Sequence, residues 1–164
     1  MSQPGADPGL LGIYLNDHLA GSTTGLELFR RAAASHRGTP AGQVLDRLTP
    51  EVEEDREQLL RIMRTLDVPV RQYKVAAGWA MEKVGRLKLN GRLLSRSPLS
   101  SVVELEALYL GVQGKGAGWR LLRVMDDPRL DPAQLDRLID RAAAQADALE
   151  ELRLSAGRAL AGRT

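Results

Sequence analysis

The stretch VVELEALYLGVQGKGAGWRLLRVM, residues 102–125, decides the fold. At 100° per residue its apolar side chains cover an arc much wider than the roughly 100° stripe that a surface helix needs. We therefore expect a helix that lies deep in the protein and contacts partners on several sides. Lys115 lies in the middle of that arc, within a heptad series where a leucine would be expected.

The sequence contains three further amphipathic stretches, two before this one and one after it. Thr39-Pro40, Ser97-Pro98 and Asp131-Pro132 each place a capping side chain before a proline at the first helical position. Pro50 interrupts the second stretch, so we expect a kink or a short break there. The apolar periodicity predicts helices over residues 10–34, 40–67, 98–125 and 132–160, preceded by a disordered tail over residues 1–9.

A long connection, residues 68–97, joins the second and third of these helices. Its apolar residues recur at helical spacing and predict a short extra helix over about residues 70–87. Two helices, a long crossover and two more helices are typical of an all-α, up-down-down-up four-helix bundle. The crossover is basic, with Glu82 as its single acidic residue and seven basic ones: Arg71, Lys74, Lys83, Arg86, Lys88, Arg92 and Arg96.

The bulk composition narrows the class further. The chain has 164 residues, a formal net charge of +2 and no cysteine. This length suits one domain with a substantial core, and the lack of cysteine excludes disulfides and thiolate chemistry. The N-terminal residues lack a signal-peptide pattern, and no apolar run approaches the roughly 18 residues of a membrane span. We therefore expect a cytoplasmic, soluble protein.

A dinuclear metal site is the first chemistry to consider for such a bundle. The usual site needs a Glu-x-x-His motif on each of two helices. The chain has only two histidines, His18 and His36, and neither completes that motif, while the helical phase places Glu54 and Glu57 in solvent. We therefore predict no catalytic residue, no metal and no other cofactor. The alternative is a nonstandard carboxylate site built from Asp17, Glu53, Glu57 or Glu150.

A polar layer is the second candidate site. Each predicted long helix carries one polar residue within its apolar arc near the midpoint: His18, Asp55, Lys115 and Gln145. A buried unpaired charge costs several kcal/mol, so each group needs a partner or a shifted pKa. We predict that Lys115 pairs with Asp55 while His18 and Gln145 complete the hydrogen bonding. The alternative is that one or more of these side chains extends to the rim, or that the helical phase differs by about 40°.

The glycines around Lys115 resemble a phosphate-binding loop only at first sight. The segment GVQGKGAG, residues 111–118, lacks the first glycine and the Ser or Thr that a P-loop requires, and no strand precedes it. Gly111, Gly114 and Gly118 share one side of the helix, so we expect a close contact with a neighbouring helix there. That contact would have to offset a propensity cost of roughly 1 kcal/mol for each glycine.

The basic crossover suggests an anionic partner. Only Tyr73 and Trp79 could stack on bases, and no nucleic-acid-reading motif is present. We therefore favour a solvated crossover or an acidic protein partner over nucleic acid. The apolar width of the third helix leaves room for a homodimer.

Three segments resemble an uncharacterised bacterial branch of the ferritin-like four-helix bundle superfamily. They are YLNDHLAG (residues 14–21), GRLKLNGR (residues 85–92) and SPLSSVVELEALYLGVQGKGAGWRLL (residues 97–122). The resemblance implies the fold, but no activity is attached to this branch. The superfamily's oxidoreductase and storage functions rest on carboxylates and histidines that this chain does not place in the usual pattern. The sequence favours a non-catalytic binding or scaffold protein over a metal-binding oxidoreductase or stress protein.

Overall fold

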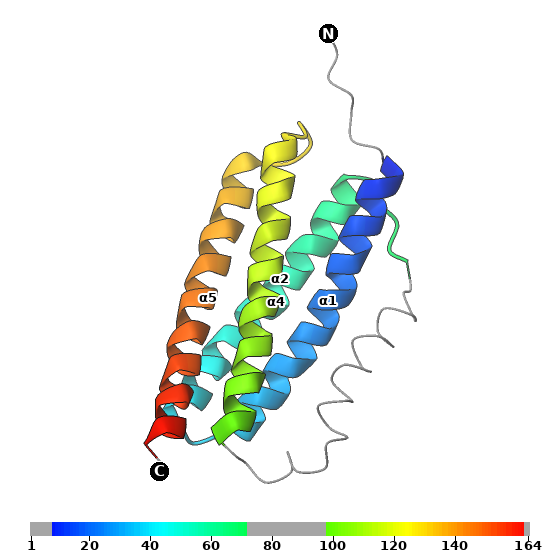
Figure 1. Ribbon diagram of the computed structural model, residues 1–164. Coiled ribbons are helices and arrows are strands. Elements are labelled where there is room, and N and C mark those ends of the chain that lie inside the picture. Colours follow the sequence, from blue (N-terminus) through cyan, green and yellow to red (C-terminus); the bar gives the residue numbers. More distant parts are fainter. Residues whose placement is uncertain (1–7, 72–97, 163–164) are drawn as a thin grey trace.

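The structure is a computed structural model that describes residues 8–71 and 98–162. Within these ranges the chain is all-α and has no strand, as predicted. Its helices agree with the predicted ranges to within two residues: α1 (Pro8–Ser35), α2 (Pro40–Thr65), α4 (Pro98–Met125) and α5 (Pro132–Ala161) (Figure 1). Helix α1 thus begins inside the predicted tail. The predicted crossover helix lies outside the described residues, apart from Val70 and Arg71, which are not helical.

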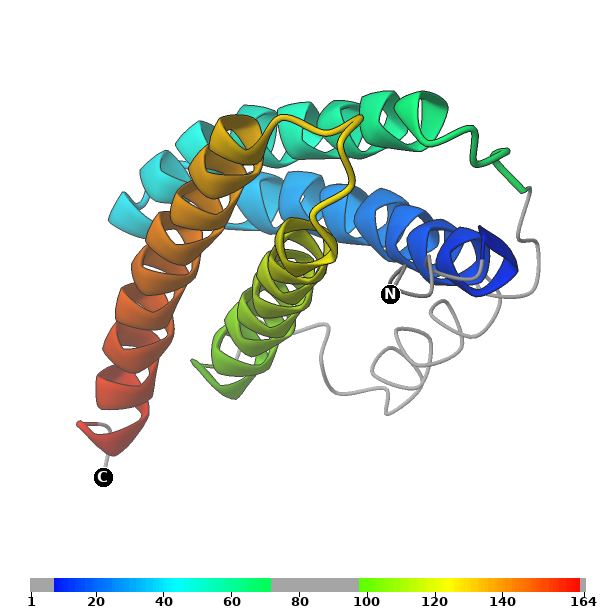
Figure 2. The same cartoon turned by 90° about the horizontal axis from the view of Figure 1, so that it is seen from above.

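The helices pack as two antiparallel pairs. Helix α1 packs closely along α2, and α4 packs closely along α5. Helices α2 and α4 run in the same direction, so the four directions follow the predicted up-down-down-up order (Figure 1). Seen from above, the α4–α5 pair is inclined to the α1–α2 pair (Figure 2). The two pairs meet where α1 faces α4 and where α2 faces α5.

The turn between α1 and α2 is fixed by a cap and a close backbone approach. The Thr39 hydroxyl accepts a hydrogen bond from the Gly42 N–H at 3.1 Å, as expected for a helix N-cap. Gly38 adopts φ +78°, a left-handed conformation that glycine adopts without strain. A Cβ at Gly42 would collide with the backbone carbonyl of His36. The turn can therefore pack onto α2 only because residue 42 has no side chain.

Pro50 does not break α2, contrary to the sequence-based expectation. The helix runs without interruption from Pro40 to Thr65. The hydrogen bond that proline removes would have gone to the carbonyl of Asp46, and both residues lie on the exposed face of the helix. Apolar side chains on the opposite face stay in phase across the proline, from Leu45 to Val52. Packing therefore keeps the helix continuous where the local signal favoured a break.

The apolar core is divided into two clusters along the bundle. One cluster includes Leu15, Leu59 and Trp119, and the other includes Leu26, Val52 and Val112, with further members from all four helices in each. Between them along the helices lie Asp55 of α2, Lys115 of α4 and Gln145 of α5, of which Asp55 and Gln145 are 1% exposed. The core is thus interrupted at mid-height by polar side chains.

Helix α4 is less enclosed than its sequence predicted. Its buried face carries Leu108 and Leu122, but Leu110 is 61% exposed, Leu121 42% and Val124 82%. The physical reason is that α4 has two helical neighbours among the described residues, α5 and α1, and these cover only part of so wide an apolar arc. No helix in the described ranges has an apolar run sufficient to cross a membrane.

Candidate functional site

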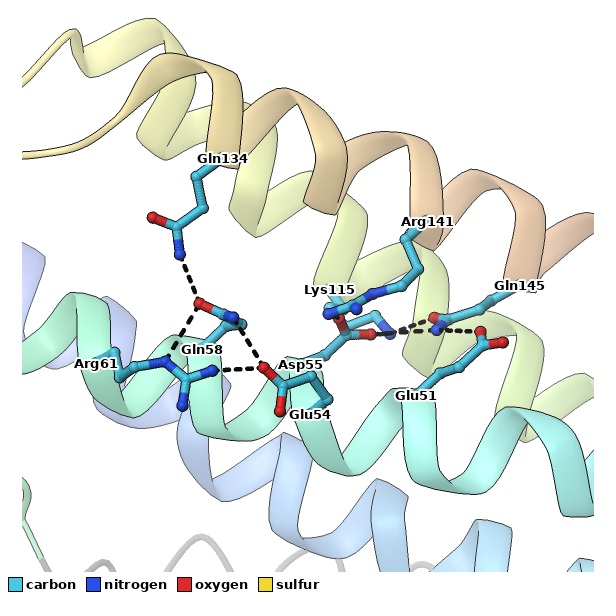
Figure 3. A network of polar contacts seen from close by, with 9 residues as sticks. All are labelled: Glu51, Glu54, Asp55, Gln58, Arg61, Lys115, Gln134, Arg141 and Gln145. Atoms are coloured by element: carbon cyan, nitrogen blue, oxygen red, sulfur yellow. Dashed lines mark hydrogen bonds and ion pairs between the residues drawn. The ribbon is translucent and has the colours of Figure 1, made fainter.

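Asp55 is the centre of the buried polar layer. Its Oδ2 atom accepts a hydrogen bond from the Lys115 ammonium at 2.5 Å and one from the Gln145 amide at 3.2 Å. Its Oδ1 atom is paired with the guanidinium of Arg141 (Figure 3). The carboxylate therefore receives donors from both α4 and α5, and the predicted contact between Lys115 and Asp55 is present.

Gln145 connects this centre to a second carboxylate. Its Oε1 atom accepts a hydrogen bond from the Lys115 ammonium at 2.5 Å, and its Nε2 atom donates to Glu51 at 3.1 Å. We call these side chains the Asp55 network: Glu51, Asp55, Lys115, Arg141 and Gln145 (Figure 3). The network holds two cations and two carboxylates, so its formal charges balance. Sequence reasoning found three of its members and missed Glu51 and Arg141.

Polar pairs also define the contact between α2 and α5. Successive rungs occur where the two antiparallel helices face one another: Glu51 with Gln145, Asp55 with Arg141, and Gln58 with Gln134 (Figure 3). The three residues are spaced by four and three along α2 and by seven and four along α5, which places them on one face of each helix. The Gln134 amide donates to Gln58 at 2.5 Å, so the series extends to the partly exposed rim. These hydrogen bonds and ion pairs therefore contribute to the register of α5 on α2.

Two opposite effects act on the charge of Lys115: burial disfavours it, and the Asp55 carboxylate stabilises it. The Lys115 side chain is 15% exposed. Burial lowers the pKa of the Lys115 ammonium, and the charge and hydrogen bond of Asp55 act in the opposite direction. Removing either partner would leave the other buried and poorly compensated. Because both Asp55 oxygens are occupied by donors, this carboxylate is not free to act as a nucleophile or general base.

A cavity of about 440 Å³ lies between α1 and α4, beside the network. Its walls are mainly apolar and include Leu28, Phe29 and Trp119, whereas Lys115 and Asp55 supply a polar region. At this level the α1 wall is formed by small residues, Gly21, Ser22 and Gly25. Three helices thus contribute to the Asp55 network, and the fourth leaves open space next to it.

His18 does not join the polar layer as predicted. It lines the α1–α4 cavity, where its ring packs against Tyr14 at a centroid separation of 4.4 Å. The ring also lies against the backbone of Gly118, where an added Cβ would approach it to 3.1 Å. Burial lowers the pKa of His18, and the charge of Asp17 partly opposes this. The predicted helical phase brings His18 to the cavity, but its ring lies against Gly118, about one helical turn along α4 from Lys115.

The glycines around Lys115 do not form the predicted close helix contact along their length. A Cβ at Gly111 or Gly114 would meet nothing within 4 Å, and the same holds for Gly25 on the facing wall. Only Gly118, against the His18 ring, makes a tight contact towards α1. The propensity cost of roughly 1 kcal/mol for each open glycine is therefore not offset by packing among the described residues.

The residues of the alternative carboxylate site do not converge. Glu53 is paired with Arg30 at 2.8 Å and Glu150 with Arg153 at 2.7 Å, both outside the core. Asp17 is exposed, and the Glu57 side chain, 45% exposed, is paired with its chain neighbour. Within residues 8–71 and 98–162 no group of three or more His, Asp or Glu side chains has a metal-binding arrangement.

A second buried polar residue, Asn16, was missed by sequence reasoning. It is 1% exposed and donates to the carbonyls of Gly12 at 2.8 Å and Pro69 at 3.1 Å. Its Oδ1 atom accepts from the Arg71 N–H at 2.7 Å. Asn16 therefore attaches the chain that follows α2 to α1. Arg71 is exposed, and the other six basic crossover residues lie outside the described part of the chain, so their binding role stays a prediction.

Comparisons with protein-family models, with curated proteins and with solved structures gave no match. What the protein does is therefore inferred from its own side chains.

Proposed function

We propose that the protein is a ferritin-like bundle that acts as a non-catalytic binding or scaffold protein. In this proposal the Asp55 network takes the place of the usual dinuclear metal site. The observation that carries it is the coordination of Asp55, whose two oxygens are bound by the ammonium of Lys115 and the guanidinium of Arg141. Bundles of this superfamily place metal cations on inward-facing carboxylates at mid-height. Here protein cations occupy the corresponding carboxylate.

The charge balance of the network supports a structural role for it. A metal ion would have to displace both Lys115 and Arg141 from Asp55, leaving two cations beside a third. The amide of Gln145 uses both its oxygen and its nitrogen within the network. The binding role itself is supported by the α1–α4 cavity, which adjoins the network and is open to a partner.

Metal analysis of the full chain, purified without chelator, tests this proposal. We expect far less than one iron, manganese or zinc per chain. About two metal ions per chain, as a dinuclear site requires, would refute it. Asp55→Asn and Glu53→Gln form a matched pair for this assay, because only Asp55 is buried. A metal that is lost in the first variant and kept in the second would identify Asp55 as its ligand.

A further inference from the structure

The α1–α4 cavity has the size and composition of a small-molecule site. Its volume of about 440 Å³ falls within the range of roughly 300–1,000 Å³ that ligand pockets occupy. Such pockets are mostly apolar and contain a few polar groups that orient the ligand. Here Leu28 and Phe29 contribute apolar wall, and Lys115 and His18 contribute polar atoms.

Glycines keep this cavity open on both sides. Gly21 and Gly25 line it from α1, and Gly111 and Gly114 line it from α4. A Cβ at any of the four would meet nothing within 4 Å. Glycine is unfavourable inside a helix, and at these positions no close approach of another helix requires it. The sequence thus leaves space at the places where larger residues would fill the cavity.

One hydrogen-bond donor on the cavity wall has a proton to spare. The Lys115 ammonium has three protons, and among the described residues it donates to Asp55 and Gln145. Lys115 lines the cavity, and its side chain is 15% exposed. The cavity wall therefore presents a charged donor beside a largely apolar surface.

We propose that the α1–α4 cavity binds a small, neutral, largely apolar molecule whose carbonyl or similar oxygen accepts from Lys115. A neutral ligand fits because the charges of the Asp55 network already balance. This inference rests on the binding role proposed above and names its ligand class.

Fluorescence titration of the full chain with prodan tests the proposal. Prodan is a neutral naphthalene with a ketone oxygen, and its emission shifts to the blue in apolar surroundings. We expect saturable binding of one prodan per chain with blue-shifted emission. A wild-type protein that shows no saturable binding would overturn the proposal.

Two leucine substitutions locate the bound probe. Gly25→Leu adds a side chain to the cavity wall, and Gly157→Leu adds the same side chain to α5, where a Cβ also meets nothing within 4 Å. Both replace a helical glycine by a strong helix former, so neither is expected to unfold the protein. We expect Gly25→Leu to weaken prodan binding by about tenfold or more, and Gly157→Leu to leave it unchanged. Equal affinities for the two variants would overturn the proposed location.

Lys115→Met tests the acceptor contact. Methionine keeps a long unbranched side chain at residue 115 and removes the ammonium. We expect prodan affinity to fall by roughly twofold to tenfold. Binding of N-phenyl-1-naphthylamine, which has no carbonyl, should stay the same and so report an intact cavity. An equal effect on both probes would overturn the acceptor contact. These titrations do not depend on metal. Two metal ions per chain, found by elemental analysis, would therefore refute the proposed non-catalytic function, whereas the probe results would still show whether the cavity binds a ligand.

Discussion

Replacing Lys115 by methionine separates the contributions of the two cations that hold Asp55. The carboxylate is 1% exposed and would keep Arg141 on Oδ1 and Gln145 on Oδ2 after the change. Removing one partner of a fully buried ion pair costs about 3–5 kcal/mol. Because Asp55 keeps two donors, we expect Lys115→Met to lower the free energy of unfolding by about 2 kcal/mol. Asp55→Leu leaves both cations without their shared carboxylate and should cost the full 3–5 kcal/mol or so.

The double variant measures how strongly the two residues are coupled. Asp55→Leu with Lys115→Met removes the pair together, so it should cost less than Asp55→Leu alone. Arg141, whose side chain is 32% exposed, can then turn towards solvent. Thermal and urea unfolding, followed by circular dichroism, give the four free energies of the cycle. For a chain of this size about 2 kcal/mol corresponds to roughly 4–8 °C in Tm.

Arg123→Met is the matched control for Lys115→Met. Arg123 also lies on α4 and pairs with a residue of α5, Asp136, at 2.9 Å, but its side chain is 39% exposed. Exposed ion pairs contribute at most about 1 kcal/mol, so this variant should change Tm little. A rise in Tm on Lys115→Met alone would refute the account of Asp55 as a carboxylate that needs the lysine. Strict additivity in the cycle would refute the coupling between them.

Three further predictions concern other parts of the fold. Gly42→Ala should destabilise the protein, whereas Gly25→Ala should stabilise it by about 0.5–1 kcal/mol, because only the first Cβ meets backbone; urea unfolding measures both. The His18 pKa lies below its ordinary value of 6.5, so its contribution to stability is present above that value and is lost as pH falls through the folded-state pKa. We expect His18→Gln to lose less stability than wild type between about pH 7.5 and about pH 5.5. Asn16→Leu should cost about 1–3 kcal/mol in urea unfolding, since it leaves the Arg71 N–H and the Pro69 carbonyl without their side-chain partner.

Each of these has an outcome that would contradict it. Stabilisation by Gly42→Ala would mean that the turn after α1 can move away from α2. An unchanged pH dependence in His18→Gln would show that His18 titrates alike in the folded and unfolded states. For Asn16 the control is Gln113→Ala, which removes an exposed amide that donates a hydrogen bond to the Tyr109 hydroxyl. Equal costs for the two amide variants would show that Asn16 does not anchor the chain after α2.

The helices were predictable because their signals are local and agree with one another. Proline after a capping residue begins α2 at Pro40 and α5 at Pro132, where the expected cap bonds from Thr39 and Asp131 are present. At Pro50 the local signal was overridden, because apolar residues on the opposite face of α2 hold the helix together. Local chemistry therefore predicts where helices begin, while tertiary packing decides whether one of them continues through a proline.

The polar layer was only partly predictable. Helical phase gives the direction in which a side chain points, but it gives neither how far the side chain extends nor how far apart two helices lie. Asp55, Lys115 and Gln145 were found as polar residues on apolar arcs, and they meet. Arg141 was missed because its guanidinium enters the core from a partly exposed position on a long side chain. His18 was expected in the layer because periodicity gives the direction of a side chain but not its position along the neighbouring helix, and its ring lies against Gly118. The open glycines were misjudged because periodicity does not give the distance between α1 and α4.

The network and the cavity have one structural origin. At mid-height the bundle must accommodate an ammonium, a guanidinium and two carboxylates, and these come from α2, α4 and α5. A bulky apolar residue on α1 at this level would bury the Lys115 ammonium further, although its pKa is already lowered by burial. Gly25 and its small neighbours avoid that cost, and the cavity is the space that they leave. A ligand with an acceptor oxygen would fill this space and also supply the missing partner for an ammonium proton. A methyl or phenyl group of the protein could fill the space but could not supply that partner.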